Sequence, residues 1–502
     1  MRDFVQNFPL FSIVGCLLGA STSAMFKGKT AKIVNTVLIV LVGAMSLSVM
    51  FYCLSHGSFT YSMGEFGAPW GNEVRGGVLE GFMGTFFALI MLLSMQGGRK
   101  KLDDEVEDSK HNLYYILVNM MLCSLIALVY TNDLFTAYVF VEINTISACG
   151  LIMIRQNGRT VEAAIRYMIM SLVGSGLFLM SLCMIYDMTG HLLMENIFDS
   201  VQVLAGTGAY KEPLTITIAF MISGLAIKSA LFPFHSWLPD AYGYSTVSSA
   251  AILSSLVSKG YIFLLIKIIF RVIGFDVVRD SKVFNVLFVF ACLGIVAGSI
   301  GAIMEKDIRR MVAYSSVAQI GYIYLGISLG TKAGMIAALF HILVHGSTKS
   351  MLFISGIGLT DVSDGSRHFG PLKGSAYRNR IAGLGFGAGA LSMVGIPLFG
   401  GFISKLLFME ASVQNYGKML PTLIVLAIST ILNAIYFMKT IVHIYNPQWD
   451  ELRDQPGYEI RKASQQKEYT VAIIVFIVLN MVLGLWSDEI LNVIEIGLDM
   501  FA

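Results

Sequence analysis

Five lysines and one glutamate lie inside hydrophobic stretches that are long enough to cross a lipid bilayer. They are Lys228, Lys259, Lys349, Lys405, Lys439 and Glu142. An ionisable group in hydrocarbon costs at least about 2.5 kcal/mol, even on the most lenient insertion scale. Membrane proteins that keep such residues usually use them to move ions. These six side chains are therefore the first candidates for chemistry.

Glu142 and Lys228 are the first candidate pair. Glu142 lies about two turns into the stretch that begins at Leu134, and Lys228 follows a long apolar-rich run. A buried lysine can release its proton when a carboxylate partner moves away, whereas an arginine stays charged. The alternatives are a static buried ion pair and, for Lys228, a side chain that extends to the membrane surface.

Three titratable residues recur in one later stretch, where His341, His345 and Lys349 are spaced at i, i+4 and i+8. This spacing places all three along one face of a helix. Histidine is the side chain best suited to relaying protons near neutral pH. A hydrogen-bonded seam between helices is a second interpretation. A metal site is the third and the least favoured, because no acidic residue lies near the two histidines as in HExxH.

The remaining lysines extend this set. Lys259 lies in the middle of a stretch that follows Lys228, and it could exchange a proton with Lys228 through water. The alternative interpretation for Lys259 is again a side chain that extends to the membrane surface. Lys405 would be the last titratable group before the outer side. Lys439 lies late in its stretch, so it is either a membrane-surface anchor or an accessory group.

Two stretches are interrupted by helix-breaking residues near a lysine. Proline removes a backbone donor and glycine loosens a helix, so each interruption predicts a broken helix. Broken backbone inside a membrane is tolerated only where it is buried in protein or lines a wet cavity. The residues concerned are Pro233 and Pro239 after Lys228, and Pro397, Gly400 and Gly401 before Lys405.

The composition places these residues in a polytopic membrane protein. The chain of 502 residues is 55% hydrophobic and only 14% charged, which is unlike a soluble enzyme. With about 20 residues for each membrane crossing, we expect an all-α protein with about fourteen transmembrane helices, the seventh and twelfth of them broken. The predicted starts are Phe8, Ile33, Val78, Tyr114, Leu134, Ala163, Leu214, Val247, Phe284, Val312, Ala333, Ile381, Pro421 and Val471.

The charged connections predict an orientation. Most lysines and arginines outside the spans follow odd-numbered spans, and Lys267 is counted among the fewer charges on the opposite side. By the positive-inside rule, both termini then face outward from the cytoplasmic membrane. The net charge of +2 indicates no nucleic-acid partner. The six cysteines form no ligand cluster, so we expect neither a structural disulfide nor a metal site.

The two broken helices also predict an internal repeat. They are five helices apart, and because five is odd they cross the membrane in opposite directions, as in an inverted repeat. The predicted organisation is three N-terminal helices and a loop in 1–112, a first five-helix repeat in 113–272, a second in 273–445, and a loop with the last helix in 446–502.

Six motifs, in this order, resemble the antiporter-like subunits shared by respiratory complex I, membrane-bound hydrogenases and Mrp-type cation/proton antiporters. They are Glu142; Lys228 followed by Phe-Pro-Phe-His-Ser-Trp-Leu-Pro-Asp-Ala; Lys259-Gly-Tyr; Asp307-Ile-Arg-Arg-Met-Val-Ala-Tyr-Ser-Ser; the helix of His341, His345 and Lys349; and Gly395-Ile-Pro-Leu-Phe-Gly-Gly-Phe-Ile-Ser-Lys405. The chain resembles the D-type Mrp subunit most. It departs from many relatives at Ile252, near which they carry a histidine.

The resemblance implies the same fold and roles for these residues. Glu142 and Lys228 would be the coupling pair, Lys259 and the histidines would connect the two halves, and Lys405 would be the terminal exchange site. It also implies work inside a multisubunit complex with other antiporter-like and small membrane subunits. A peripheral redox arm with iron-sulfur, flavin or NiFe centres could be among those partners, while this chain itself would hold no cofactor.

The function predicted from these features is proton translocation, with exchange for sodium as one form. A structural subunit with a vestigial polar axis, which couples its neighbours mechanically, is the alternative. A third interpretation, a self-sufficient transporter of a small solute, lacks the polar residues expected of a substrate-sized cavity.

Overall fold

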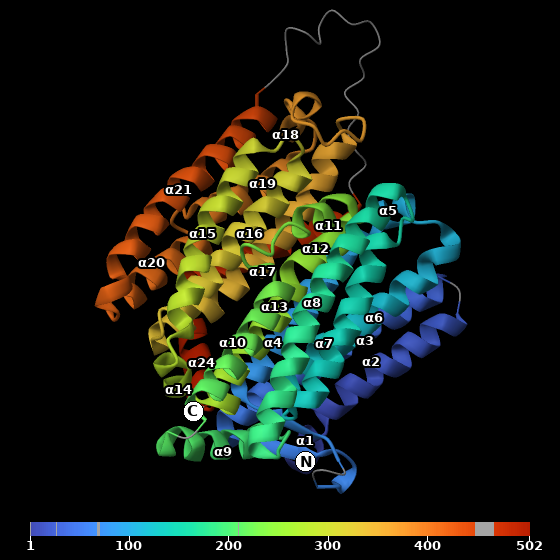
Figure 1. The fold of residues 1–502 in the computed structure, drawn as a ribbon. Coiled ribbons are helices and arrows are strands. Elements are labelled where there is room, and N and C mark those ends of the chain that lie inside the picture. The colour runs from blue at the N-terminus through green and yellow to red at the C-terminus, as the bar shows by residue number, and fades with distance from the viewer. Residues whose placement is uncertain (1, 27, 68–70, 209, 447–465, 502) are drawn as a thin grey trace, which may run out of the picture.

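The computed structural model describes residues 2–501 except 27, 68–70, 209 and 447–465 (Figure 1). Most of the loop predicted at the start of 446–502 therefore lies outside the described residues. The described part is almost entirely helical. Its one two-stranded sheet pairs β1 (Phe59–Ser62) antiparallel to β2 (Glu73–Gly76), with Phe59 opposite Gly76.

The helices follow one another with short connections. The first part of the chain forms α1 (Arg2–Gln6), α2 (Phe8–Met25), α3 (Gly28–His56), α4 (Val78–Gly97), α5 (Arg99–Glu105), α6 (His111–Tyr130), α7 (Leu134–Met153), α8 (Gly158–Thr189) and α9 (Met194–Thr207). The middle part forms α10 (Lys211–Lys228), α11 (Leu238–Tyr244), α12 (Val247–Ile252), the π-helical η3 (Leu253–Val257), α13 (Ser258–Ile268), the π-helical η4 (Ile269–Ile273) and α14 (Phe275–Asp280).

The last part continues the same pattern. It forms α15 (Val283–Met304), α16 (Ile308–Ser328), α17 (Lys332–Asp361), α18 (Ser375–Arg378), α19 (Arg380–Val394), α20 (Gly400–Val413), α21 (Tyr416–Ile444), α23 (Lys467–Leu485) and α24 (Ser487–Asp499). Several starts have a clear local cause, because the side chains of Asp133, Asn157 and Asp307 accept backbone N–H groups of the first turns of α7, α8 and α16.

The predicted fold class is confirmed. A helix begins at or shortly before each of the fourteen predicted starts, and the predicted seventh and twelfth spans are broken into α10 with α11 and α19 with α20. Ten helices of the described part are each long and apolar enough to cross a membrane by themselves. The count of fourteen crossings stays a prediction.

The helices run roughly side by side, so the bundle has two ends (Figure 1). Both chain termini and α9 lie at one end, which we call the terminal face. Helices α5 and α18 lie at the other end, which we call the loop face. Helix α9 lies across the terminal face.

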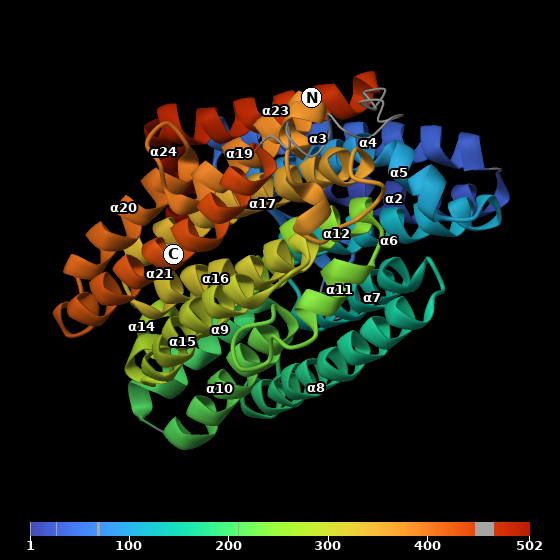
Figure 2. The ribbon, with the colours of Figure 1, turned by 90° about the horizontal axis from the view of Figure 1, so that it is seen from above.

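Helix α17 forms the centre of the bundle (Figure 2). It is buried along nearly its whole length and packs against α16, α19, α20 and α23. By contrast, outer helices such as α3, α8 and α15 expose large apolar side chains. Exposed apolar surface of this extent is expected where helices face lipid.

The placement of Lys267 corrects the sequence analysis. Lys267 was expected among the charges of the surface connections, but its side chain is fully buried within α13. The helix continues past Lys267 into η4, and the hydrophobic pattern alone does not reveal that neighbouring helices cover this position. The protein therefore holds a further buried lysine.

The six cysteines all lie within the described residues, and each has a free thiol. Cys16, Cys53 and Cys123 are buried, whereas Cys183 is exposed on the outside of α8.

A buried ion pair between Glu105 and Arg309 ties α5 to α16 at the loop face. The two charged groups are 3.6 Å apart and their side chains are 9% and 5% exposed. We expect Glu105→Ala to destabilise the protein by about 3 kcal/mol, because it leaves a buried guanidinium unpaired. Thermal unfolding of the detergent-solubilised complex measures this loss.

Glu468→Ala is the matched control, since it breaks the exposed pair with Arg99. Such a pair contributes about 1 kcal/mol at most. Equal effects of the two substitutions would contradict the structural role assigned to Glu105.

Candidate functional site

Glu142 and Lys228 lie in direct contact. The Lys228 Nζ is 3.3 Å from the Glu142 Oε1, which joins α7 to the end of α10. The lysine side chain is fully buried, while the glutamate side chain is 26% exposed. The carboxylate thus lies at the edge of the bundle and the ammonium inside it.

Hydroxyl groups surround this ion pair. Lys228 also donates to the Thr145 Oγ1 at 2.7 Å, and Ser175 donates a hydrogen bond to the Glu142 carboxylate. The Lys228 ammonium lies 5.6 Å from the centre of the Tyr261 ring, and the Tyr261 hydroxyl donates to the Asn144 Oδ1. Because Thr145 can still hold the ammonium, Lys228 has a second partner when the carboxylate moves.

Lys259 is fully buried and has no carboxylate partner among the described residues. Its Nζ donates to the Ser254 carbonyl at 2.5 Å and to the Ser258 Oγ at 3.0 Å. Ser254 belongs to the π-helical turn η3. A π-helical turn departs from the α-helical hydrogen-bond ladder and is often found at functional sites.

The three residues of α17 lie along one face of the helix, as their spacing predicts. The His341 and His345 rings are stacked with centres 6.2 Å apart. The Lys349 Nζ donates to the Val312 carbonyl at 3.1 Å and to the Ser315 hydroxyl, both near the start of α16. Both ring nitrogens of His345 are buried without a hydrogen-bond partner among the described residues.

Lys405 lies at the second helix break and is partly buried. Its Nζ donates to the Val394 carbonyl, the last of α19, at 2.5 Å and to the Thr430 Oγ1 of α21 at 3.0 Å. The neighbouring Ser404 contacts the His341 Nδ1 at 2.6 Å. Ser404 therefore connects α20, the helix that carries Lys405, with the central helix α17.

The predicted helix-breaking residues occupy different positions at the two breaks. Pro233 lies between α10 and α11 and Pro397 between α19 and α20, whereas Pro239 lies in the first turn of α11. Gly400 and Gly401 open α20, and a Cβ at Gly401 would lie only 1.8 Å from the Ser392 carbonyl oxygen. A glycine is therefore required at this close approach.

Both breaks also contain a residue with positive φ that is not glycine. These are Ala230 (φ 63°) and Leu398 (φ 91°). Such backbone conformations cost about 1 to 3 kcal/mol and cluster at functional sites. The two breaks thus share a strained backbone as well as a nearby lysine.

The buried lysines share a mode of binding. Lys259, Lys349 and Lys405 each donate to a backbone carbonyl and a hydroxyl, whereas Lys228 contacts a carboxylate. A carbonyl accepts a hydrogen bond from the charged form without forming an ion pair. Among the described residues, these three lysines therefore have no carboxylate in contact.

Together these side chains form a row across the bundle, which we call the polar axis. It consists of Glu142, Lys228, Lys259, His341, His345, Lys349 and Lys405. The row runs from α7 and α10 on one side, through α13 and the central α17, to α20 on the other side (Figures 1 and 2). Its two ends, Glu142 and Lys405, are the members with partial exposure.

The axis is not a continuous chain of hydrogen bonds, and His345 is bonded to none of its other members among the described residues. Among the described residues, no hydrogen bond joins Lys228 to Lys259 or Lys259 to His345. Lys439 is not part of it, because its side chain is exposed on α21. The sequence alternative of a surface anchor therefore fits Lys439 better than an accessory site inside the protein.

Several polar partners were missed by the sequence analysis. Thr145 and Ser404 could have been found, since they lie three residues after Glu142 and next to Lys405. Ser175, Ser315 and Thr430 come from other helices. Isolated hydroxyl residues in apolar helices give no sequence signal of their partners.

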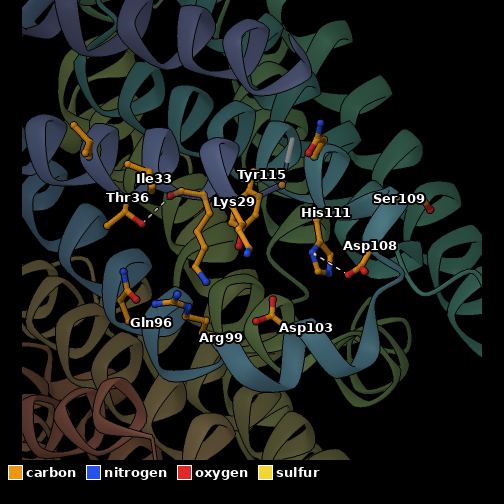
Figure 3. Close-up of a pocket in the computed structure, with 14 residues that line it drawn as sticks. Lys29, Ile33, Thr36, Gln96, Arg99, Asp103, Asp108, Ser109, His111 and Tyr115 are labelled. Carbon is orange, nitrogen blue, oxygen red and sulfur yellow. Dashed lines mark hydrogen bonds and ion pairs between the residues drawn. The ribbon is translucent and has the colours of Figure 1, made fainter. Parts of the chain in front are cut away.

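One cavity of the described part lies away from the axis, at the loop-face ends of α3, α5 and α6. It has a volume of about 1290 Å³. Figure 3 shows Lys29, Arg99 and Asp103 around it, with His111 and Asp108 paired at one side. No residue of the polar axis lines it. Among the described residues, no three His, Cys, Asp or Glu side chains are grouped to hold a metal ion.

The fold and the axis define a multi-pass membrane protein with ionisable groups at the centre of its helical bundle. The sequence pattern of the family described as NADH:quinone oxidoreductase/Mrp antiporter, TM, matches residues 131–432. Subunit N of the NADH-quinone oxidoreductase of Desulforudis audaxviator is 32% identical over 437 residues, which are 86% of this chain and 85% of that protein. The chain therefore belongs to this family of antiporter-like membrane subunits.

Further similarities point the same way. The putative antiporter subunit mnhD2 of Staphylococcus haemolyticus is 28% identical over 92% of this chain and 87% of that protein. A chain of the archaeal membrane-bound sulfane sulfur reductase has the same fold, with a TM-score of 0.86, 24% identity, and coverage of 100% and 97% of the two chains. A chain of the Mrp complex of Dietzia sp. DQ12-45-1b has a TM-score of 0.84 at 23% identity, with coverage of 99% and 97%. These relatives are parts of multisubunit complexes.

Proposed function

We propose that this chain carries protons along the polar axis within a multisubunit complex of the cytoplasmic membrane. The observation that carries the proposal is the row of buried ionisable groups from Glu142 to Lys405, most of which have no fixed counter-charge. The relatives include both an oxidoreductase subunit and antiporter subunits. Accordingly the driving force is either a redox reaction in partner subunits or exchange with sodium.

In this proposal, the Glu142–Lys228 pair is the input. When Glu142 moves away, the ammonium loses its ion-pair partner and its proton is released toward Lys259; when the pair re-forms, Lys228 takes up a new proton. The hydroxyl of Thr145 keeps the side chain in place throughout. The contact is at the bundle edge, where a neighbouring subunit could displace the carboxylate.

Water completes the middle of the axis in this proposal. Buried polar atoms without a protein partner are ordinarily bound by water, and both ring nitrogens of His345 lack one among the described residues. We therefore infer water between Lys259, His345 and Lys349. His341 then passes the proton through Ser404 to the region of Lys405, where it leaves.

The assembly is part of the same proposal. Other antiporter-like and small membrane subunits would contact the two exposed ends of the axis, and iron-sulfur, flavin or NiFe centres would lie only in a peripheral arm. The inverted repeats 113–272 and 273–445 would each hold one half of the axis, flanked by 1–112 and 446–502. The terminal face would lie on the outer side, as the positive-inside rule indicates.

Glu142→Gln tests this function. The amide keeps the size of the side chain and its contact with Ser175 but removes the charge, so we expect proton transport to fall about tenfold per assembled complex, which corresponds to about 1.4 kcal/mol. Inverted membrane vesicles with a pH-sensitive dye measure transport, started either by an electron donor or by a sodium pulse. The two starts distinguish the redox-driven from the sodium-exchanging complex.

Glu162→Gln is the matched control, because Glu162 is exposed on α8 and pairs with Arg166 at the surface. Its transport should equal that of the parent. Normal transport by an assembled Glu142→Gln complex would instead support the structural alternative, in which the axis is vestigial.

A further inference from the structure

A second group of buried charges lies near the terminal face, outside the polar axis. Arg75 of β2, Glu80 of α4 and Lys267 of α13 are 4%, 0% and 0% exposed. Arg271 of η4 lies close by, with its Nη1 atom buried. Lys267 is thus within electrostatic reach of Glu80, Arg75 and Arg271, which come from separate elements.

The hydrogen bonds among the described residues of this group do not use every buried polar atom. Arg75 donates to the Glu80 Oε1 at 2.5 Å, while the Glu80 Oε2 is buried with no partner among the described residues. Lys267 donates to the Val129 and Thr131 carbonyls at 2.9 and 2.5 Å. These carbonyls lie at the C-terminal end of α6, where the helix dipole favours a cation.

Buried hydroxyls continue from Glu80 toward the membrane interior. The Ser46 Oγ and the Tyr130 hydroxyl are buried, and apart from each other they have no partner among the described residues. Both lie next to Gly84, one turn after Glu80, since a Cβ there would be 2.8 and 3.4 Å from them. Buried polar atoms of this kind normally bind water. These hydroxyls therefore supply hydrogen-bond partners for water on a path that leads inward from Glu80.

Aromatic rings separate this group from the polar axis. Lys267 follows Lys259 by two helical turns, a rise of about 12 Å, and Phe263 lies midway between them. The Phe501 ring lies 6.2 Å from the Phe263 ring, and the Arg75 guanidinium lies 5.4 Å from the Phe501 ring. Arg75 also donates to the Met500 carbonyl, so the charged group holds the segment after α24 in place.

We propose that Glu80 and Lys267 form a second proton-exchange site, through which the polar axis communicates with the terminal face, and that Phe263 and Phe501 form its gate. The proposal rests on the proposed function and adds an exit to it. When the rings separate, water connects Lys259 with Lys267. Once Lys267 has given up its own proton, an N–H bond of the Lys259 ammonium breaks as one forms on the Lys267 amine.

The proton leaves Lys267 for the Glu80 carboxylate, which becomes the neutral acid. Glu73 lies two residues before Arg75 on β2, is less buried than Glu80, and accepts a hydrogen bond from the Asn132 side chain at 2.5 Å. Loss of the proton from Glu80 on this side restores the ion pair with Arg75. The charged groups that face the site are Glu73, Arg75 and Arg271, together with the Tyr130 hydroxyl.

Transport by complexes with Glu80→Gln or Lys267→Met tests the exchange site. We expect a loss of at least about tenfold per assembled complex, the lower part of the range for removing a proton-transfer group. Glu80→Asp should restore part of the rate, because it keeps an acidic group. Glu495→Gln, an exposed carboxylate on α24, should leave the rate unchanged.

Three results separate the possible failures. Normal transport by assembled Glu80→Gln and Lys267→Met complexes, with transport lost in Lys228→Ala, would overturn the exchange site alone. Normal transport in all three would overturn the proposed function as well. Loss of complex without loss of rate per complex would assign Glu80 a structural role and would also overturn the site.

Phe501→Ala tests the gate. Removal of the ring opens the way between Lys259 and Lys267, so we expect passive proton leak through the idle complex to rise at least severalfold, measured as decay of an imposed pH difference across reconstituted vesicles. Phe501→Leu, which keeps an apolar side chain, should leak less. An unchanged leak in Phe501→Ala would overturn the gate.

Discussion

Lys228→Ala is expected to abolish proton transport, with a loss of about 100-fold or more, since this is the usual contribution of a positioned proton-transfer group. The substitution removes the fully buried ammonium that contacts both Glu142 and Thr145. Dye quenching in inverted vesicles, normalised to the amount of assembled complex, measures the loss. Carboxylate movement alone cannot replace a missing proton carrier.

Lys228→Arg distinguishes a need for proton transfer from a need for positive charge alone. An arginine keeps the positive charge and can pair with Glu142, but it does not release its proton in proteins. We therefore expect normal assembly with transport as low as in Lys228→Ala. Recovery of transport in Lys228→Arg would mean that a fixed charge suffices, which contradicts proton transfer through this residue.

Lys405→Ala is expected to have a comparably large effect, again about 100-fold, because it removes the side chain that we propose as the terminal proton carrier at the second helix break. The Lys405 ammonium donates hydrogen bonds to the Val394 carbonyl and to the Thr430 hydroxyl. Among the described residues it pairs with no carboxylate, so its removal leaves no buried carboxylate without a partner. Assembly should therefore survive. The same vesicle assay and the yield of purified complex report the two effects separately.

Lys439→Ala is the matched control for this experiment. It removes a lysine from α21, the helix that also carries Thr430, but from its exposed surface. Its transport should remain close to that of the parent. A loss in Lys439→Ala as large as in Lys405→Ala would show that the assay responds to lysine removal in general.

The sequence predicts the helices and the axis residues because both depend on local pattern. Apolar stretches define where helices start, and Pro233 and Pro397 interrupt them wherever the chain packs. The spacing of His341, His345 and Lys349 fixes a common helix face before any tertiary contact is known. Ionisable residues inside such stretches stand out because burying them is costly.

The partners of these residues depend on packing between distant helices and could not be predicted. Ser175 contacts Glu142 across α7 and α8, and the Ser254 carbonyl is presented to Lys259 by a π-helical turn. Lys267 was misplaced for a related reason. A lysine near the end of an apolar stretch can lie either at the surface or under a neighbouring helix, and the sequence is the same in both cases. Here the end of α6 covers Lys267.

The lysines bound by main-chain carbonyls have a mechanical consequence. A carbonyl oxygen cannot be protonated or substituted, and its position depends only on the path of the helix. If the π-helical turn at Leu253–Val257 tightened to a regular α-helix, the Ser254 oxygen would turn away from Lys259. Lys259 would then keep only the Ser258 hydroxyl as a partner, so a change in helix shape would weaken the binding of its charged form and act on the charge inside the bundle.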